Sequence, residues 1–365
     1  MSGTSLDGVD GVLTSIPDNY SGDSLLMLAA AHVAFPSALR ADLMALQTAD
    51  ENEIEREALA ANVLTQRYAD CVAQLLTQVD MTAEHVSAIG VHGQTIRHRP
   101  ELGFTRQTNN PALLAELTGI DVIADFRSRD IAAGGQGAPL VPAFHQAVFG
   151  QTGETRVVVN IGGISNISVL HGDGRITGFD TGPGNMLMDA WVAQHQGLAY
   201  DADGVWAASG EVCVALLDRM LTEPFLALPP PKSTGRDLFH LDWLANRLQA
   251  FSSARVEDIQ ATLAAFTATT IANAIAAYAP SASAVYVCGG GAYNTHLMQQ
   301  LQHALQARGQ DARLESTAVL GISPDQVEAL AFAWLAQRFC LRQPGNLPAV
   351  TGAKGLRMLG ALYPA

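Results

Sequence analysis

The segment Gly3–Asp10 (GTSLDGVD) holds three kinds of group that can bind a phosphorylated ligand. A turn at its two glycines would present backbone N–H groups, and the hydroxyls of Thr4 and Ser5 would add donors to phosphate oxygens. Asp7 or Asp10 could hold magnesium, which prefers hard oxygen ligands. A polar N-terminal turn without a ligand is the alternative for these residues taken alone.

Two further glycine-rich segments are candidates for nucleotide contacts. In Asn160–Ser168 (NIGGISNIS), the pair Gly162–Gly163 would let a ligand approach the backbone closely. In Gly289–Asn294 (GGGAYN), glycine backbone could pack on a flat ring such as adenine. A simple turn and a helix start with positive φ are the alternatives. Neither Walker A spacing nor Gly-x-Gly-x-x-Gly after a strand is present, which counts against a P-loop or Rossmann site.

Asp180 is the candidate general base. In Phe179–Asn185 (FDTGPGN) it ends an apolar segment, and the glycines and proline that follow predict a tight turn before a helix. A carboxylate at the carboxyl end of a strand, above a helix start, is well placed to accept a proton from a reactant. An Asx-turn or a helix cap is the alternative.

A basic group follows in His92–His98 (HGQTIRH) and DFRSRD. Two histidines six residues apart do not have metal-ligand spacing, which favours structural or substrate hydrogen bonds. Arg127 and Arg129 could supply the bidentate fork that a carboxylate-bearing substrate requires. Pairing of these arginines with Asp125 or Asp130 at the surface is the alternative.

Glu328 lies near the start of a predicted helix. Ser323–Gln326 (SPDQ) resembles a capping box with proline in the first turn. Glu328 would lie on the flank of the apolar stripe, half-buried or facing a cleft, although a lone glutamate there is usually solvated. The stripe itself is formed by Val327, Leu330, Ala331 and Trp334.

The elements that must position these residues occur in the same order twice. The second half predicts three strands, helices and two more strands, at residues 157–161, 166–170, 175–180, 186–197, 241–278, 283–291 and 312–315. The first half repeats this order without the first strand, at residues 9–16, 25–35, 39–79, 87–93 and 121–125. The repetition predicts a duplicated α/β core.

The composition excludes several classes of protein. The chain has 365 residues, 48% hydrophobic and 15% charged, so it can bury a sizeable core in one or two domains. Its net charge of −14, without a basic run, argues against a nucleic-acid or anionic-membrane binder. The four cysteines have no paired spacing, and neither a signal peptide nor a bilayer-spanning run is evident. We therefore expect a cytoplasmic protein with reduced thiols.

Taken together, the motifs resemble the anhydro-N-acetylmuramic acid kinase family. The blocks are MSGTSLDGVD, HGQTIRH, ADFRSRDIAAGGQGAPLVP, NIGGISNI, GFDTGPGN, KSTGRDLF and NLPAVTGA, which span residues 1–353. The resemblance implies an α/β fold of duplicated ribonuclease-H-like domains, of actin/sugar-kinase type, with a central nucleotide cleft. The expected domains are residues 1–130 and 131–345, with 346–365 packing back on the first.

The resemblance also implies a site. Asp180 matches the catalytic aspartate, and Thr95, Arg127 and Glu328 match sugar contacts. ATP and Mg²⁺ are the implied cofactors, with Asp7 as a candidate magnesium ligand. The implied ATP-binding residues are Gly3, Thr4, Ser5, Leu6, Asp7, Gly8, Val9, Asp10, Gly162, Gly163, Asn166, Gly289 and Gly290.

The implied reaction converts 1,6-anhydro-N-acetylmuramate, ATP and water into N-acetylmuramate 6-phosphate and ADP, in peptidoglycan recycling and amino-sugar catabolism. A kinase of the same fold acting on another amino sugar, and a non-catalytic actin- or chaperone-like ATP switch, are the alternatives. A metal-dependent hydrolase lacks the ligand spacing. The sequence leaves the oligomeric state open, with a homodimer as one candidate.

One feature departs from the family pattern. The family has an apolar strand immediately before the Gly3–Asp10 segment, whereas this sequence starts at Met1. Either the start is truncated or wrongly assigned, or another segment replaces the strand. Loss of a central strand would leave its neighbours with unpaired edges, which brings stability and ATP affinity into question.

Overall fold

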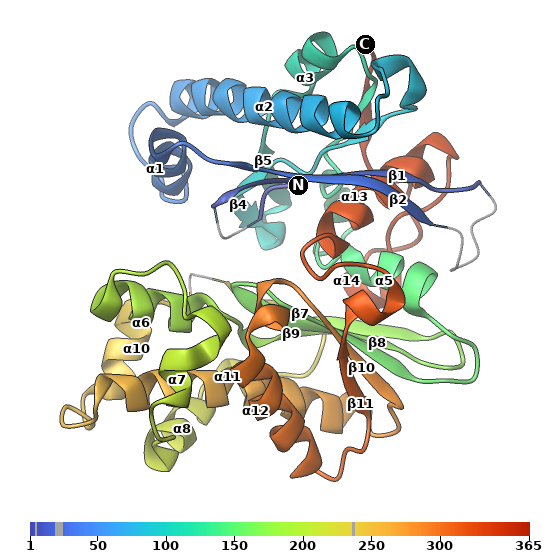
Figure 1. Ribbon diagram of the computed structural model, residues 1–365. Coiled ribbons are helices and arrows are strands. Elements are labelled where there is room, and N and C mark those ends of the chain that lie inside the picture. Colours follow the sequence, from blue (N-terminus) through green and yellow to red (C-terminus); the bar gives the residue numbers. More distant parts are fainter. Residues whose placement is uncertain (4–5, 19–24, 236–237) are drawn as a thin grey trace. The chain divides into compact units, whose positions relative to one another are not determined.

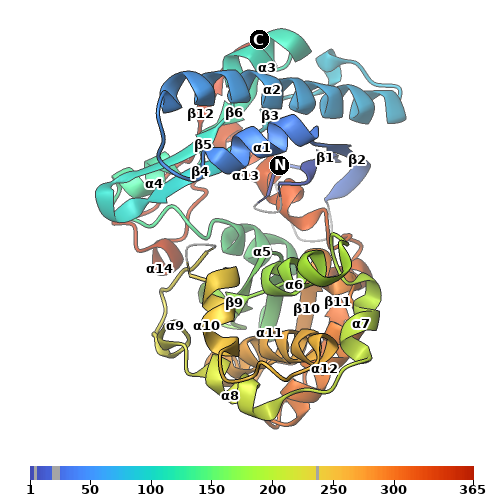
Figure 2. The ribbon, with the colours of Figure 1, turned by 90° about the vertical axis from the view of Figure 1, so that its left-hand side faces the viewer.

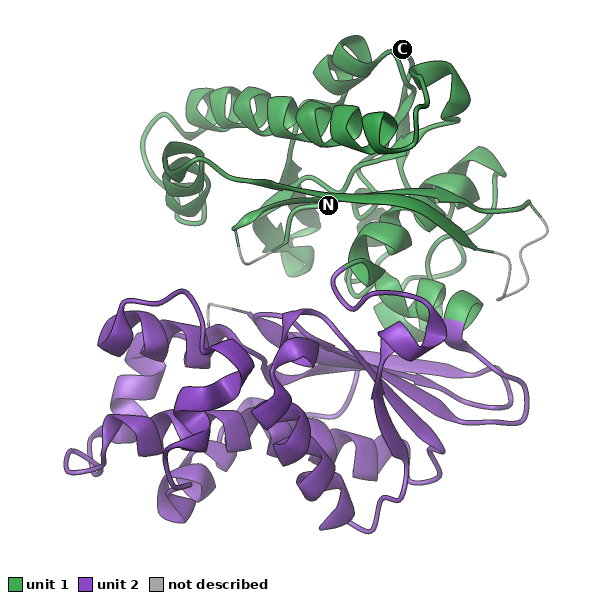
Figure 3. Ribbon diagram, viewed as in Figure 1, with its two compact units in different colours: residues 1–148, 326–365 green, residues 149–325 purple. Residues whose placement is uncertain are grey.

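The computed structural model describes residues 1–3, 6–18, 25–235 and 238–365 (Figure 1). The chain forms two compact units (Figure 3). Unit 1 contains residues 1–148 and 326–365, and unit 2 contains residues 149–325. The predicted boundaries at residues 130 and 345 would place α13 (Val327–Cys340) in the second domain. In the structure α13 contacts β1 and β3 and therefore lies in unit 1.

Unit 2 contains one continuous five-stranded sheet in the order β11-β10-β7-β8-β9. The β7–β8 and β8–β9 pairs are antiparallel, whereas β10 pairs with β7, and β11 with β10, in parallel. The residues of β7 and β10 are mainly β-branched or aromatic and almost wholly buried, which suits central strands. The strands are β7 (Arg156–Ile161), β8 (Ile164–Leu170), β9 (Ile176–Pro183), β10 (Ala284–Cys288) and β11 (Arg313–Ser316).

Helices complete the core of unit 2. The longest is α11 (Val256–Tyr278), which contacts β8, β9 and α12 (Figure 2). By length and composition α11 could span a membrane, but 78% of its most apolar window is buried, as in a core helix. The others are α6 (Met186–Gln196), α7 (Val205–Ala208), α8 (Val214–Leu221), α9 (Pro224–Ala227), α10 (Leu241–Leu248) and α12 (Thr295–Gln306).

Unit 1 distributes its strands over three small sheets. β1 (Gly8–Ser15) and β2 (Leu26–Ala34) form an antiparallel pair, as do β4 (Gln94–Arg99) and β5 (Phe104–Thr108). A third sheet has the order β12-β6-β3. Its strands are β3 (Ile89–Gly90), β6 (Val122–Ala124) and β12 (Ala361–Tyr363).

The helices of unit 1 pack on these sheets. α2 (Glu53–Gln78) buries Leu64, Tyr68 and Cys71 against the β1–β2 pair. The others are α1 (Ser37–Ala45), α3 (Pro111–Thr118), α4 (Ser128–Ala132), α5 (Val141–Phe149), α13 and α14 (Pro348–Thr351). The strand–strand–helix–strand order repeats that of unit 2, and the predicted duplicated α/β fold class is confirmed.

The two units differ at the strand that precedes each glycine loop. In unit 2, β7 lies between β8 and β10 and joins the sheet. Among the described residues of unit 1, no named strand joins β1 to β3 in this way. Met1 pairs with one residue of β1, because its amine donates to the Asp10 carbonyl at 2.8 Å and its carbonyl accepts from the Asp10 N–H at 2.9 Å. β3 is short, with two residues where a strand over residues 87–93 was expected.

Candidate active site

A row of polar side chains crosses the apolar sheet of unit 2. Asn160 on β7 lies opposite Asn166 on β8, and Asn166 lies opposite Asp180 on β9. Directly opposed residues point to the same face of a sheet, so the three side chains form one row. All three are half-buried, next to fully buried neighbours such as Val159 and Phe179. The sheet therefore carries a polar site within an apolar core.

Asp180 is held by a distant segment of the chain. Its carboxylate Oδ2 accepts from the N–H of Thr234 at 2.9 Å, and its own N–H donates to the carbonyl of Lys232 at 3.1 Å. This partner is 54 residues away, so the hydrogen bond is neither an Asx-turn nor a cap of α6. Burial raises the pKa of Asp180 to about 7, although the Thr234 N–H and the Lys232 charge oppose the rise. Such a carboxyl can accept a proton at neutral pH.

Three glycine-containing loops meet beside this row. The N–H groups of Gly184 and Asn185 donate to the carbonyls of Gly163 and Gly162, at 2.9 and 2.8 Å. Gly289 has a φ of +78°, and a Cβ there would lie 2.4 Å from Asn160 Oδ1, so this position requires glycine.

The surface above two of these glycines is open. A Cβ added at Gly162 would have no neighbour nearer than 3.6 Å, and one at Gly290 none nearer than 3.7 Å. Exposed backbone at the junction of strands and a helix start is suited to phosphate oxygens or a flat ring. The structure thus brings together Gly162, Gly163, Gly289 and Gly290, which the sequence predicted as one nucleotide site.

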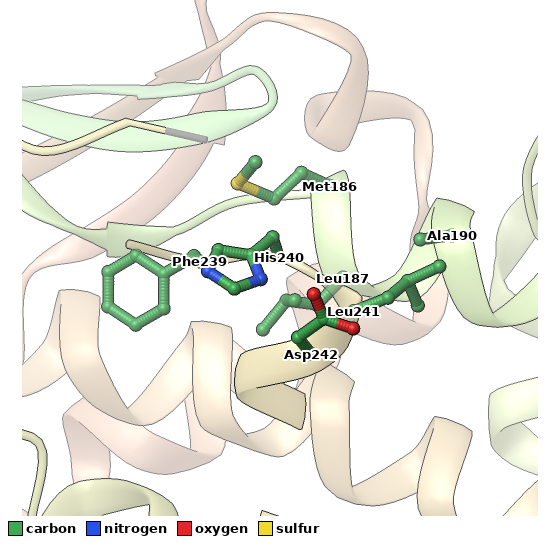
Figure 4. A pocket seen from close by; sticks show the side chains of 7 residues that line it. All are labelled: Met186, Leu187, Ala190, Phe239, His240, Leu241 and Asp242. Carbon is green, nitrogen blue, oxygen red and sulfur yellow. The ribbon is translucent and has the colours of Figure 1, made fainter. Parts of the chain in front are cut away.

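A pocket of about 400 Å³ lies where α6 and α10 begin (Figure 4). Its wall combines apolar side chains with a histidine and a carboxylate. His240 Nδ1 also caps α10, because it accepts from the N–H of Trp243. The lining residues are Met186, Leu187, Ala190, Phe239, His240, Leu241 and Asp242, and the sequence predicted none of them.

In unit 1, the Gly3–Asp10 segment leads into β1. The Leu6 N–H donates to the Gly3 carbonyl at 3.4 Å, and Leu6 has a φ of +57° and a buried side chain. Thr4 and Ser5 lie outside the described residues. Gly8 and Val9 are buried at the start of β1.

The carboxylates of this segment differ in their surroundings. Asp10 is 2.7 Å from His32 Nδ1 across the β1–β2 pair, whereas Asp7 is exposed. Within the described ranges, no group of three or more His, Cys, Asp or Glu could hold a metal. A magnesium ion carried by a nucleotide would require only one protein carboxylate, for which the exposed Asp7 is the candidate.

Arg127 is fixed by His92, one of the two histidines for which the sequence favoured structural or substrate hydrogen bonds. The Arg127 Nε and Nη2 groups donate to His92 Nε2 at 3.0 and 2.9 Å, and Nη1 donates to the Gly137 carbonyl at 2.8 Å. Burial and the Arg127 charge keep the pKa of His92 well below its usual value. Neutral His92 therefore has the lone pair that accepts these bonds.

Glu328 lies on α13, close to the same arginine. Burial lowers the pKa of Arg127 to about 10, and the charges of Glu328 and Asp130 oppose this change. One turn further along α13, the Phe332 ring lies 4.6 Å from that of His92. Helix α13 thus supports both members of the His92–Arg127 pair.

The predicted capping box before α13 is wrong. The helix begins after Gln326, which makes no side-chain cap. Ser323 Oγ instead bonds to Asp325 Oδ1 at 2.6 Å. Two nearby polar side chains satisfy each other and do not reach the helix N–H groups.

Thr95 lies on β4 of unit 1 and is half-buried. Its Oγ1 accepts from Gln107 Nε2 at 3.1 Å, and Gln107 is its partner on β5. The structure thus gathers His92, Arg127 and Glu328, with Thr95 on the strand that follows His92.

The match with known proteins extends over the whole chain. A family model described as "Anhydro-N-acetylmuramic acid kinase" matches residues 1–365. The protein of that name from Burkholderia orbicola (strain MC0-3) is 59% identical over 365 residues, which cover 100% of this chain and 95% of that protein. The protein of the same name from Paraburkholderia xenovorans (strain LB400) is 57% identical over 365 residues, which cover 100% of this chain and 96% of that protein.

Among solved structures, the activator of the 2-hydroxyisocaproyl-CoA dehydratase from Clostridium difficile with bound ADPNP aligns with a TM-score of 0.47. Its sequence identity is 12%, with 92% of this chain and 96% of that chain covered.

The whole-chain match places this protein among the kinases, enzymes that transfer a phosphoryl group. Within that class, the chain belongs to the anhydro-N-acetylmuramic acid kinase family.

Proposed function

We propose that this chain uses ATP and water to convert 1,6-anhydro-N-acetylmuramate into N-acetylmuramate 6-phosphate. Family membership supports the substrate, and the environment of Asp180 supports the chemistry. The observation that carries the proposal is the half-buried Asp180 carboxyl, whose pKa near 7 suits a general base.

The structure of the substrate determines which group loses a proton and which bond breaks. Its O6 is tied to C1, so there is no free 6-hydroxyl to deprotonate. We infer that Asp180 takes a proton from water as the water oxygen bonds to C1. The electron pair of the C1–O6 bond stays on O6, which bonds to the γ-phosphorus as the bond to ADP breaks. The proton on Asp180 then leaves to solvent.

Phosphorus captures the departing O6, so no general acid is needed. Ordinary glycosidases instead use a pair of carboxyl groups for the two proton transfers. A bound magnesium ion would neutralise charge on the phosphates, with Asp7 as the candidate protein ligand. The open glycine backbone at Gly162 and Gly290 is the candidate contact surface for the nucleotide.

The pH dependence should follow the ionisation of Asp180. A base acts only in its deprotonated form, and the pKa of this carboxyl is about 7. We expect kcat/KM for the sugar to fall about tenfold per pH unit below that value and to level off above it. Initial rates at saturating ATP test this. A flat profile from about pH 5 to about pH 8 would contradict the assignment.

His92→Ala should weaken sugar binding through Arg127. The substitution removes the acceptor of two Arg127 N–H bonds, so the guanidinium loses its fixed direction. We expect KM for the sugar to rise about tenfold, the equivalent of one charge-assisted hydrogen bond, with KM for ATP unchanged. His92→Gln, whose amide oxygen can accept, should restore much of the loss. Exposed His303→Ala is the control. Equal rises in both KM values would contradict a role on the sugar side.

Sugar-dependent ADP release separates this proposal from its alternatives. Purified protein with ATP and magnesium should release ADP when the anhydro sugar is added. Free N-acetylmuramate or N-acetylglucosamine should give little release. Preferential release with a free sugar would favour another amino-sugar kinase. ATP-dependent assembly without any sugar response would favour a non-catalytic switch.

A further inference from the structure

The KSTGRDLF block contains a segment, Lys232–Thr234, that holds Asp180 at two points. The Lys232 carbonyl accepts the Asp180 N–H at 3.1 Å, and the Thr234 N–H donates to Asp180 Oδ2 at 2.9 Å. Both contacts use backbone groups, so the position of the carboxylate depends on where this segment lies. The side chain of Lys232 connects this segment to α9.

Lys232 is anchored although its side chain is long. Its Nζ donates to the carbonyls of Phe225 and Leu226, at 3.2 and 2.9 Å. The same ammonium lies 4.8 Å from the centroid of the Phe225 ring and 5.8 Å from that of Phe179, the residue before Asp180. Two carbonyls and two ring faces restrict a group that is usually mobile.

The ammonium is also the charge that acts on the Asp180 carboxyl. The facing residue on β8 is neutral Asn166, and α9 has no titratable side chain. From α11, the neutral Thr267 and Thr270 approach the end of β9, and the ring of Tyr278 lies 4.8 Å from that of Phe179. Glu223, which precedes α9, is paired with Arg247 at 2.8 Å.

We propose that Lys232 is a positioning residue for Asp180, which fixes the segment that orients the carboxylate and supplies the positive charge that favours its ionised form. The part that concerns catalysis rests on the proposed function. Burial lowers the pKa of Lys232, while the Asp180 charge opposes the change. This is expected of two opposite charges that interact where they are partly shielded from solvent.

Carboxyl ¹³C NMR of aspartate-labelled protein tests the pairing without turnover. The Asp180 resonance is assigned by its loss in Asp180→Asn. We expect Lys232→Met to raise the titration midpoint of Asp180 by about one pH unit, because a nearby positive charge is removed. Lys232→Arg should keep the midpoint near that of the wild type, as should Ser233→Ala at the exposed neighbour. An unchanged midpoint in Lys232→Met would overturn the proposal.

The pH dependence of kcat/KM provides the second test of the proposal. In Lys232→Met, the acid limb of kcat/KM should move upward with the NMR midpoint, and the plateau should fall about tenfold as orientation is lost. A lower plateau with an unmoved acid limb would indicate a merely structural lysine and overturn the proposal. If Lys232→Met fails to fold, Lys232→Arg provides the test. An Asp180 midpoint displaced by about one pH unit from the wild-type value in Lys232→Arg would contradict the proposal. Absence of turnover in the wild type would refute the proposed function, while the NMR result would still decide the pairing.

Discussion

Asp180→Asn is expected to lower kcat for sugar-dependent ADP release by about a thousand-fold, because general-base catalysis contributes about 10²–10⁴-fold. Asparagine keeps the shape of the side chain and an oxygen that can accept from Thr234, but it cannot take a proton from water. The dissociation constants of ATP and of the sugar should change less than about threefold. Single-turnover rates and calorimetric titrations measure the two effects separately.

Asp173→Asn is the matched control, because Asp173 is an exposed carboxylate in the hairpin that leads into β9. It should keep wild-type turnover. Residual activity of about a tenth in Asp180→Asn would assign the base to another group. An equal loss in the control would indicate damage to the hairpin.

Asp130→Ala is expected to lower the free energy of unfolding by about 3–5 kcal/mol, since it removes a buried acceptor of several hydrogen bonds. Asp130 Oδ2 accepts from the Gly137 N–H at 2.8 Å. Its Oδ1 accepts from Asn346 Nδ2 and Thr351 Oγ1, at 2.7 and 2.8 Å. The carboxylate is wholly buried and joins the segment after β6 to the last part of the chain.

A Cβ at Gly135 would lie 2.2 Å from Asp130 Oδ2, so the Gly135 backbone packs closely against the carboxylate that the substitution removes. The substitution should also loosen Gly137, whose carbonyl accepts from Arg127. Chemical denaturation, followed with a spectroscopic probe in each unit, measures the decrease in the free energy of unfolding. Exposed Asp42→Ala on α1 is the control and should change stability by less than about 0.5 kcal/mol. A similarly small change in Asp130→Ala would contradict the structural role.

The local sequence pattern was sufficient to predict most helices and strands of unit 2. The β-branched run that became β7 and the Asp-Gly hairpin between β8 and β9 depend on neighbours in the sequence. The same holds for α6, which ends before Gly197 in a left-handed conformation. Asp180 could be proposed as a base because the sequence pattern predicted both the strand end and the helix start beside it.

The partners of the site residues could not be predicted in the same way. Thr234 and Lys232 reach Asp180 across more than 50 residues, and His92 reaches Arg127 across 35. No periodicity encodes such pairs, because they depend on tertiary packing. Asn160 had a weaker signal, a polar residue at the end of a buried strand, that could have placed it in the row with Asn166.

Stoichiometric product analysis tests the central claim most directly. Purified protein is incubated with ATP, magnesium and the anhydro sugar, and ADP and the sugar product are quantified together by mass spectrometry. The account predicts one ADP per product, and a product heavier than the anhydro sugar by one phosphoryl group and one water. ADP without a phosphorylated sugar, or a phosphorylated sugar that has not gained water, would contradict it.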